Sequence, residues 1–153
     1  MKTYRLMFIA ALGMCSVVMP ACEATKQALT SAPDVSKLFG DWNLSQLGGK
    51  EIASMIPSGG TTPTLSIAKD GGISGTGGVN RIMSSVDLDK LASGEFSMRP
   101  AASTMMAGNQ QAMDLEANYL KTLHQITNFR LDGNTLSLTN GKETLLKFLR
   151  AGS

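Results

Sequence analysis

Residues 129–149 read FRLDGNTLSLTNGKETLLKFL, and they carry the clearest structural signal in the chain. Apolar and polar side chains alternate on both sides of Asp132-Gly133-Asn134, and Asn140-Gly141 leads into a further alternating run. Alternation is the period of a strand with one buried face, and Asp-Gly and Asn-Gly supply the positive φ angles of tight hairpin turns. The stretch therefore predicts successive antiparallel strands.

Upstream of this stretch, short alternating runs are separated by glycine-rich turns, which is typical of an antiparallel β domain. The expected strands are Trp42–Leu47 before Gly48-Gly49, Lys50–Ile52, Thr64–Ile67 before Asp70-Gly71-Gly72, Ile73–Gly75 and Phe96–Met98. With the three strands near the C-terminus, the sequence predicts about eight strands.

One segment, Asn109–Gln125, departs from this rhythm because it lacks glycine and proline and is rich in helix formers. Its apolar face is expected at three- and four-residue spacings, and Asn109 is the expected N-cap. The face comprises Met113, Leu120 and Leu123 with Ala112, Glu116 and Tyr119. The predicted fold is α+β and mostly β: a strongly curled, open and barrel-like antiparallel sheet packed on a single α-helix.

Charge argues against a nucleic-acid partner. The 153 residues, a length typical of one domain, include 14 Lys and Arg against 12 Asp and Glu, a formal net charge of +2. Lys2 and Arg5 are the only charged side chains before Cys22, so the remaining chain holds 12 basic and 12 acidic residues. A neutral chain carries no electrostatic footprint for a phosphate backbone.

The N-terminal segment reads as an export signal. The apolar run Leu6–Met19 follows the two basic residues, and at 1.5 Å per residue it covers only about 21 Å of the roughly 30 Å that a membrane span needs. Val18-Met19-Pro20-Ala21-Cys22 resembles a bacterial lipobox. We expect residues 1–21 to be a lipoprotein signal peptide and Cys22 to carry acyl chains, palmitate among them.

Ordinary cleavage after Ala21 or Ala24 is the alternative, but it would leave Cys22 as one unpaired thiol in an exported protein. Glu23 follows Cys22 in place of the Asp that resembles an inner-membrane retention signal, which favours the outer membrane, on either face. Residues 22–36 are polar, contain Pro33 and are expected to form a flexible tether.

Several blocks together resemble the META domain of HslJ-type heat-shock lipoproteins. They are Leu38–Leu44, Pro63–Ile67, Gly75–Arg81, Ser103–Ala107, Glu116–Leu120 and Leu131–Leu136. The resemblance covers roughly Lys37–Leu149, and we expect the domain at residues 37–151. It implies a small curled antiparallel sheet on one helix, exported and often lipid-anchored, linked to envelope stress and without established enzymatic chemistry.

The chain departs from that family at two positions. Related sequences often have Cys where this chain has Val79, before Asn80-Arg81, and Cys where it has Gly108, after Met106-Ala107. The joint absence is expected if the two cysteines form a disulfide in relatives, because the loss of one alone would leave a free thiol. Thiol chemistry is therefore excluded for the domain.

Candidate chemical groups are few. His124 is the only histidine, which excludes a site with several histidine ligands, and its place at the end of the predicted helix suits a cation. The glycines of Gly71–Gly78 miss the spacing of a dinucleotide-binding loop and are expected in turns and bulges. No catalytic residue, cofactor or metal is expected.

Two sets of residues have both a structural and a functional interpretation. Asn80 and Arg81 either contact a partner, with Arg81 on a carboxylate, or are structural, with Asn80 bonding turn backbone and Arg81 pairing with a local acid such as Asp87. The methionines have three interpretations: core filler, thioether ligands for copper, or an adaptable contact surface. They are Met83, Met98, Met105, Met106 and Met113.

Two functions follow as hypotheses. The favoured one is a non-enzymatic, monomeric envelope lipoprotein that is held at a bilayer through Cys22. Its domain would bind an unidentified envelope protein as a stress-related, chaperone-like or protease-inhibitory module. The alternative is a binder of a lipid or another small hydrophobic ligand, which requires space between helix and sheet that Met113, Leu120 and Leu123 leave unfilled.

Overall fold

The computed structural model describes residues 34–152. The expected signal peptide, the expected lipidation site Cys22 and the expected tether up to Pro33 lie outside the described residues. The last residues assigned to the tether, Asp34–Ser36, enter a 3-10 turn, η1 (Val35–Lys37), which the Asp34 side chain caps.

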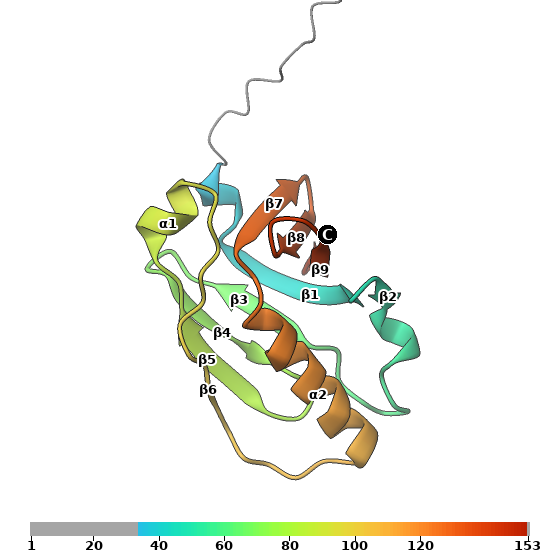
Figure 1. Ribbon diagram of the computed structural model, residues 1–153. Coiled ribbons are helices and arrows are strands. Elements are labelled where there is room, and N and C mark those ends of the chain that lie inside the picture. Colours follow the sequence, from blue (N-terminus) through green and yellow to red (C-terminus); the bar gives the residue numbers. More distant parts are fainter. Residues whose placement is uncertain (1–33, 153) are drawn as a thin grey trace, which may run out of the picture.

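The described residues form a nine-stranded antiparallel sheet with one long helix, which confirms the predicted mostly-β class (Figure 1). The strands are β1 Gly40–Leu47, β2 Lys50–Glu51, β3 Thr64–Ile67, β4 Gly72–Thr76, β5 Arg81–Ser85, β6 Ala102–Ser103, β7 Asn128–Asp132, β8 Thr135–Thr139 and β9 Thr144–Arg150. Their order is β6-β5-β4-β3-β1-β9-β8-β7, with β2 paired to β1. Since this path ends at β6 and β7, the sheet is open.

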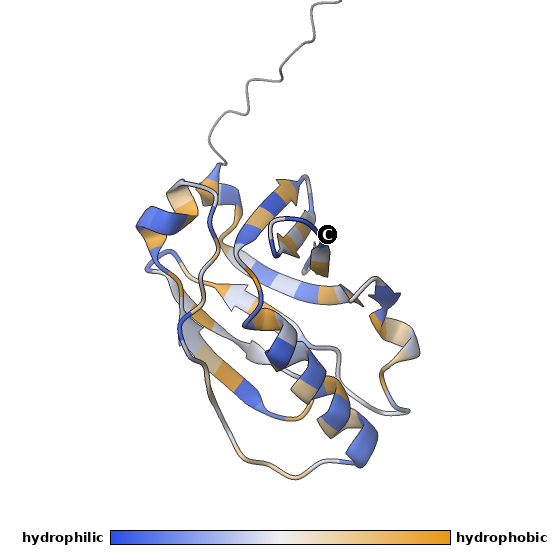
Figure 2. Ribbon diagram, in the orientation of Figure 1, coloured by the Kyte–Doolittle hydropathy of each residue, from blue (hydrophilic) through white to orange (hydrophobic). Residues whose placement is uncertain are grey.

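The predicted hairpins are present. β1 turns into β2 over Gly48-Gly49, β3 into β4 over the Asp70-Gly71 turn, and β7 into β8 with Asp132 paired to Thr135. Gly71 has φ 84° and Gly133 has φ 54°, values that L side chains rarely adopt. Figure 2 shows the alternation of hydrophobic and hydrophilic residues along the strands that set these registers.

Several elements differ from the sequence prediction. β5, β6 and a short helix, α1 (Leu88–Ala92), were not expected, and Phe96–Met98 is not a strand. Its neighbourhood instead makes two isolated bridges, Val86 to Met98 and Glu95 to Asn128. β6 is too short for periodicity to identify, α1 has little more than one helical turn, and in β5 the apolar Ile82 and Met83 are adjacent, which breaks the alternation.

The long helix, α2 (Gln110–Leu123), begins where the sequence places it, because the Asn109 side chain accepts a hydrogen bond from the Ala112 N–H at 2.8 Å. Its buried face is centred on Leu115, Tyr119 and Leu123, whereas Met113 and Leu120 are half-buried. The observed buried face is therefore rotated slightly around the helix axis relative to the face predicted from the sequence.

The core between α2 and the sheet is filled by large side chains. Tyr119 meets Phe148 edge to face with ring centroids 6.4 Å apart, and its hydroxyl donates to the Thr64 carbonyl at 3.3 Å. Trp42 is fully buried and donates to the Leu38 carbonyl at 2.9 Å. Burial raises the pKa of the Tyr119 phenol.

Over the described residues, no helix has the length and apolar character needed to cross a membrane.

Candidate functional site

A buried carboxylate connects α2 to the turn between β4 and β5. Glu116 is 5% exposed and accepts hydrogen bonds from the backbone N–H groups of Val79 at 3.1 Å and Asn80 at 2.6 Å. Its other oxygen accepts from the Asn80 side-chain amide at 2.7 Å. Gly77 makes room for this contact, because a Cβ there would lie 2.4 Å from the Glu116 Cγ. Glu116 thus satisfies turn backbone that is removed from water.

Asn80 extends the same network to the loop before α2. Its side-chain oxygen accepts from the Thr104 hydroxyl at 2.9 Å and from the Met106 N–H at 2.6 Å, and its amide donates to the Met106 carbonyl at 3.3 Å. Asn80 is 3% exposed. One side chain therefore joins the β4–β5 turn, α2 and the Thr104–Met106 loop.

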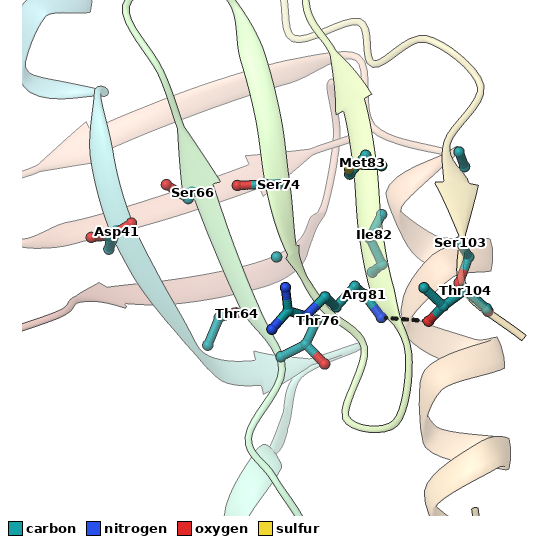
Figure 3. A pocket seen from close by; sticks show the side chains of 12 residues that line it. Asp41, Thr64, Ser66, Ser74, Thr76, Arg81, Ile82, Met83, Ser103 and Thr104 are labelled. Carbon is teal, nitrogen blue, oxygen red and sulfur yellow. Dashed lines mark hydrogen bonds between the residues drawn. The ribbon is translucent and has the colours of Figure 1, made fainter. Parts of the chain in front are cut away.

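Arg81 is placed differently from the structural interpretation. The predicted ion pair with Asp87 is absent among the described residues, because the Asp87 carboxylate instead caps α1 by accepting from Asp89 and Lys90 N–H groups. Arg81 is exposed, and its backbone N–H donates to the Thr104 hydroxyl at 3.1 Å. Its side chain lies on the outer face of the sheet (Figure 3).

The two positions where related sequences have cysteine are adjacent. A Cβ on Gly108 would lie 3.5 Å from the Val79 Cβ and 2.8 Å from its Cγ2. Disulfides join Cβ atoms that are about 3.5–4.5 Å apart. In this chain the Val79 side chain occupies the space that a side chain at position 108 would need.

At and beside the Thr104–Met106 loop, three methionines are exposed to solvent. We call Met83, Met105 and Met106 the methionine surface. Met105 is 100% exposed, Met83 65% and Met106 59%. Met105 and Met106 line a depression of about 620 Å³ together with the half-buried Met113, and we call it the methionine depression. Met98 lies apart from this group and packs against the core. Within the described residues, no group of three His, Cys, Asp or Glu side chains is arranged to hold a metal ion.

A second depression, of about 690 Å³, lies on the outer face of β1, β3, β4, β5 and β6, and we call it the hydroxyl groove (Figure 3). Cross-strand pairing sets its residues in two rows. One row is Asp41, Ser66, Ser74, Met83 and Ala102, and the next is Thr64, Thr76 and Arg81. Their neighbours Trp42, Leu65, Ile73 and Ile82 alternate with them and point into the core.

Several polar groups of the hydroxyl groove have no partner within residues 34–152. They are the Asp41 carboxylate, the Arg81 guanidinium and the hydroxyls of Ser66 and Ser74. The Thr76 hydroxyl is engaged, since it donates to the Asn80 carbonyl at 3.0 Å and accepts from the Gly78 N–H at 3.1 Å. The hydroxyl groove and the methionine depression share Ser103 and Thr104, so the two form one continuous surface.

Sequence reasoning identified Asn80, Arg81 and the methionines but missed the hydroxyl groove. Ser66 and Ser74 are eight residues apart in the sequence, and only the pairing of β3 with β4 brings them together. His124 is the exposed C-terminal cap of α2, as expected. It lines neither the hydroxyl groove nor the methionine depression.

Comparisons with known proteins give a family and a fold. The META domain family model matches residues 36–153, and no curated protein matches the chain. An NMR structure of a protein from Burkholderia xenovorans is 27% identical, with a TM-score of 0.58, and the match covers 84% of this chain and 97% of that one. A second NMR structure is 25% identical, with a TM-score of 0.56 and coverage of 75% and 93%.

A third structure shows likeness of fold alone. The crystal structure of a DUF4847 family protein from Bacteroides vulgatus is 16% identical, with a TM-score of 0.52, and the match covers 78% of this chain and 99% of that one.

Proposed function

The chain belongs to the META domain family, and from that premise we propose that it is a non-enzymatic envelope lipoprotein whose domain binds a protein partner. The observation that carries the proposal is the methionine surface, where Met83, Met105 and Met106 face solvent beside one edge of the sheet. Burying such side chains against a partner is favourable by about 25 cal/mol per Å² of apolar surface.

Methionine suits a contact that must adapt to its partner. The side chain is unbranched, and its polarisable thioether packs well against irregular or aromatic surfaces. The loop that carries Met105 and Met106 is anchored at one end, because Asn80 bonds both the N–H and the carbonyl of Met106. The side chains are therefore free to adjust while the backbone that presents them is held.

The filled interior favours partner binding over the alternative function, a carrier of small hydrophobic ligands. Trp42, Tyr119 and Phe148 are fully buried in the single cluster of core residues that joins α2 to the sheet. An acyl chain would have to displace these side chains, and protein interiors at native density resist such displacement.

We also propose that the open sheet curls into a barrel-like form. It is supported by the segment around Phe96, which bridges β7 through Glu95 and Asn128 and bridges the end of β5 through Val86 and Met98. The Phe96 N–H also donates to the Thr127 carbonyl at 2.8 Å. These bonds link both sides of the open sheet at one end and favour a rigid surface for a partner.

We place the protein at the bacterial outer membrane, anchored through an acylated Cys22 after removal of residues 1–21, with a role in the response to heat or envelope stress. The lipobox-like Val18–Cys22 supports the anchor, and Glu23 after the cysteine supports the outer membrane. Several acyl chains hold a protein stably at a bilayer, since each buried CH₂ contributes about 0.8 kcal/mol.

Metabolic labelling tests the anchor. Cells grown with a clickable palmitate analogue should label the wild-type protein and the Cys15→Ala control, and should not label the Cys22→Ala variant. Labelling that persists in Cys22→Ala, or that is absent from the wild type, would show that Cys22 is not the anchor.

Quantitative affinity capture tests the partner-binding function. Full-length protein with Met105→Ser and Met106→Ser should recover about tenfold less of each specific envelope partner than the wild type, because the exposed apolar contact is lost. The matched control is Lys142→Ser, an exposed change in the β8–β9 turn. Equal recovery by all three proteins, or recovery of no specific protein, would contradict the proposal.

A further inference from the structure

The floor of the hydroxyl groove is made of small side chains between longer ones. Ser66 on β3 and Ser74 on β4 are cross-strand partners, Met83 and Arg81 stand on β5, and Asp41 stands on β1. Neighbouring strands lie about 4.8 Å apart, so β5 and β1 are separated by about 14 Å across β4 and β3. The result is a trough that an extended chain can enter.

Arg81, on β5, is the one cationic side chain among the described residues that line this trough. Within residues 34–152 the Arg81 guanidinium forms neither an ion pair nor a hydrogen bond, and Figure 3 shows it extending over Thr76 toward Thr64. Its Cα is held by the pairing with Thr76 and by the bond from its N–H to Thr104. A guanidinium presented in this way matches a carboxylate, which it binds through two parallel hydrogen bonds.

The rest of the trough complements a peptide backbone. The hydroxyls of Ser66 and Ser74 can each donate to a carbonyl or accept from an N–H, and both lack a partner within the described residues. The Asp41 carboxylate beyond them accepts from N–H donors or an ammonium group. A peptide whose carboxylate lies on the Arg81 guanidinium therefore has its amino end directed toward the Asp41 carboxylate, and its backbone passes beside the hydroxyls of Ser66 and Ser74.

We propose that the hydroxyl groove binds the C-terminal end of an extended peptide, with its free carboxylate on Arg81 and its backbone over Ser66 and Ser74. The guanidinium reaches over β4, which is two strand spacings of about 4.8 Å from β1, so about three extended residues, at about 3.4 Å each, span the distance to Asp41. The exposed Met83 side chain, in the same row as Ser74, provides an apolar contact for the peptide. The inference rests on the proposed partner binding and names the part of the partner that is recognised.

Titration of isotope-labelled full-length protein with tetra-alanine tests the inference. Amide resonances of Ser66, Ser74 and Met83 should shift saturably. The C-terminal amide of the same peptide should bind about tenfold more weakly, because the charge-assisted bonds to Arg81 are lost. N-acetylation should weaken binding less, because it removes only the ammonium opposite Asp41.

Variants locate the carboxylate site. Arg81→Gln should bind tetra-alanine about tenfold more weakly than the wild type. The control Arg130→Gln changes an exposed arginine on β7, at the other end of the strand order, and should bind as the wild type does. An unchanged fingerprint of the remaining amides shows that each variant is folded.

Several outcomes would overturn the inference: equal binding of acid and amide, equal binding by Arg81→Gln, shifts confined to another surface, or no saturable shift with any peptide. Those outcomes leave the proposed function standing if partner capture still depends on Met105 and Met106. Conversely, if the groove binds the peptide but partner capture does not depend on Met105 and Met106, the proposed role of the methionine surface is wrong and the peptide site stands.

Discussion

The buried Glu116 carboxylate accepts a hydrogen bond from the Asn80 backbone N–H at 2.6 Å and another from the Asn80 side-chain amide at 2.7 Å. The two residues are 36 positions apart in the chain. Their contact joins the only long helix of the described residues to the β4–β5 turn. Through Asn80, it also joins the helix to the loop that presents the methionine surface.

Removal of this carboxylate is expected to destabilise the domain. Glu116→Ala leaves the buried N–H groups of Val79 and Asn80 without an acceptor, and each such group costs about 1–3 kcal/mol. Urea denaturation should show a lower free energy of unfolding by at least about 2 kcal/mol. The control, Asp114→Ala, changes an exposed carboxylate of the same helix and should fall within about 0.5 kcal/mol of the wild type. Equal loss in both variants would refute a specific role for Glu116.

An engineered disulfide is expected to form between positions 79 and 108. In Val79→Cys/Gly108→Cys the two Cβ atoms lie at disulfide distance, so the oxidised double variant should be about 2–4 kcal/mol more stable than its reduced form. Peptide mapping under non-reducing conditions identifies the cross-link, and denaturation with and without reductant measures its effect. The single variants are the controls. If both engineered thiols stay free after oxidation, the placement of Val79 beside Gly108 is wrong.

Alkaline pH is expected to unfold the domain through Tyr119. Burial raises its pKa above the ordinary value of 10.0, so the folded protein keeps the phenol proton that the unfolded chain releases. Above about pH 10 the folded state binds more protons, and the free energy of unfolding should fall by up to about 1.4 kcal/mol per pH unit. Tyr119→Phe should lack this component of the slope between pH 9 and about pH 12. Identical slopes in the two proteins would show that Tyr119 does not carry the effect.

The methionine surface is expected to contribute little to stability. Met105→Ser and Met106→Ser change exposed side chains and should alter the free energy of unfolding by no more than about 0.5 kcal/mol. Trp42→Ala, in the core, should lose about 3–5 kcal/mol under the same denaturation protocol. A large loss from the methionine variants would mean that these side chains are structural.

Local signals predicted much of the fold. The glycine-containing turns fixed the hairpins because positive φ is a property of the residue itself, and Asn109 marked the start of α2 by its capping side chain. β6 and α1 were missed because they are too short to show a period, and β5 was missed because the exposed Met83 beside the buried Ile82 breaks its alternation. The ion pair expected between Arg81 and Asp87 was wrong, since Asp87 satisfies the helix end nearest to it.

The candidate site was predicted only in part, because its geometry comes from pairing between distant segments. Spacing placed Glu116 on the inner face of the helix, yet nothing in the sequence indicated that it would bond Asn80. The hydroxyl groove likewise exists only once β1, β3, β4 and β5 lie side by side. Such contacts form only in the tertiary structure, so a local sequence pattern cannot predict them.

The most direct test of the partner-binding function is site-specific photo-crosslinking in growing cells. A benzophenone amino acid at position 105 replaces a fully exposed methionine, and the same group at position 142 reports an exposed turn away from the methionine surface. We predict a discrete adduct with an envelope protein from position 105 and none from position 142. No adduct from position 105, or the same adducts from both positions, would contradict the proposed function.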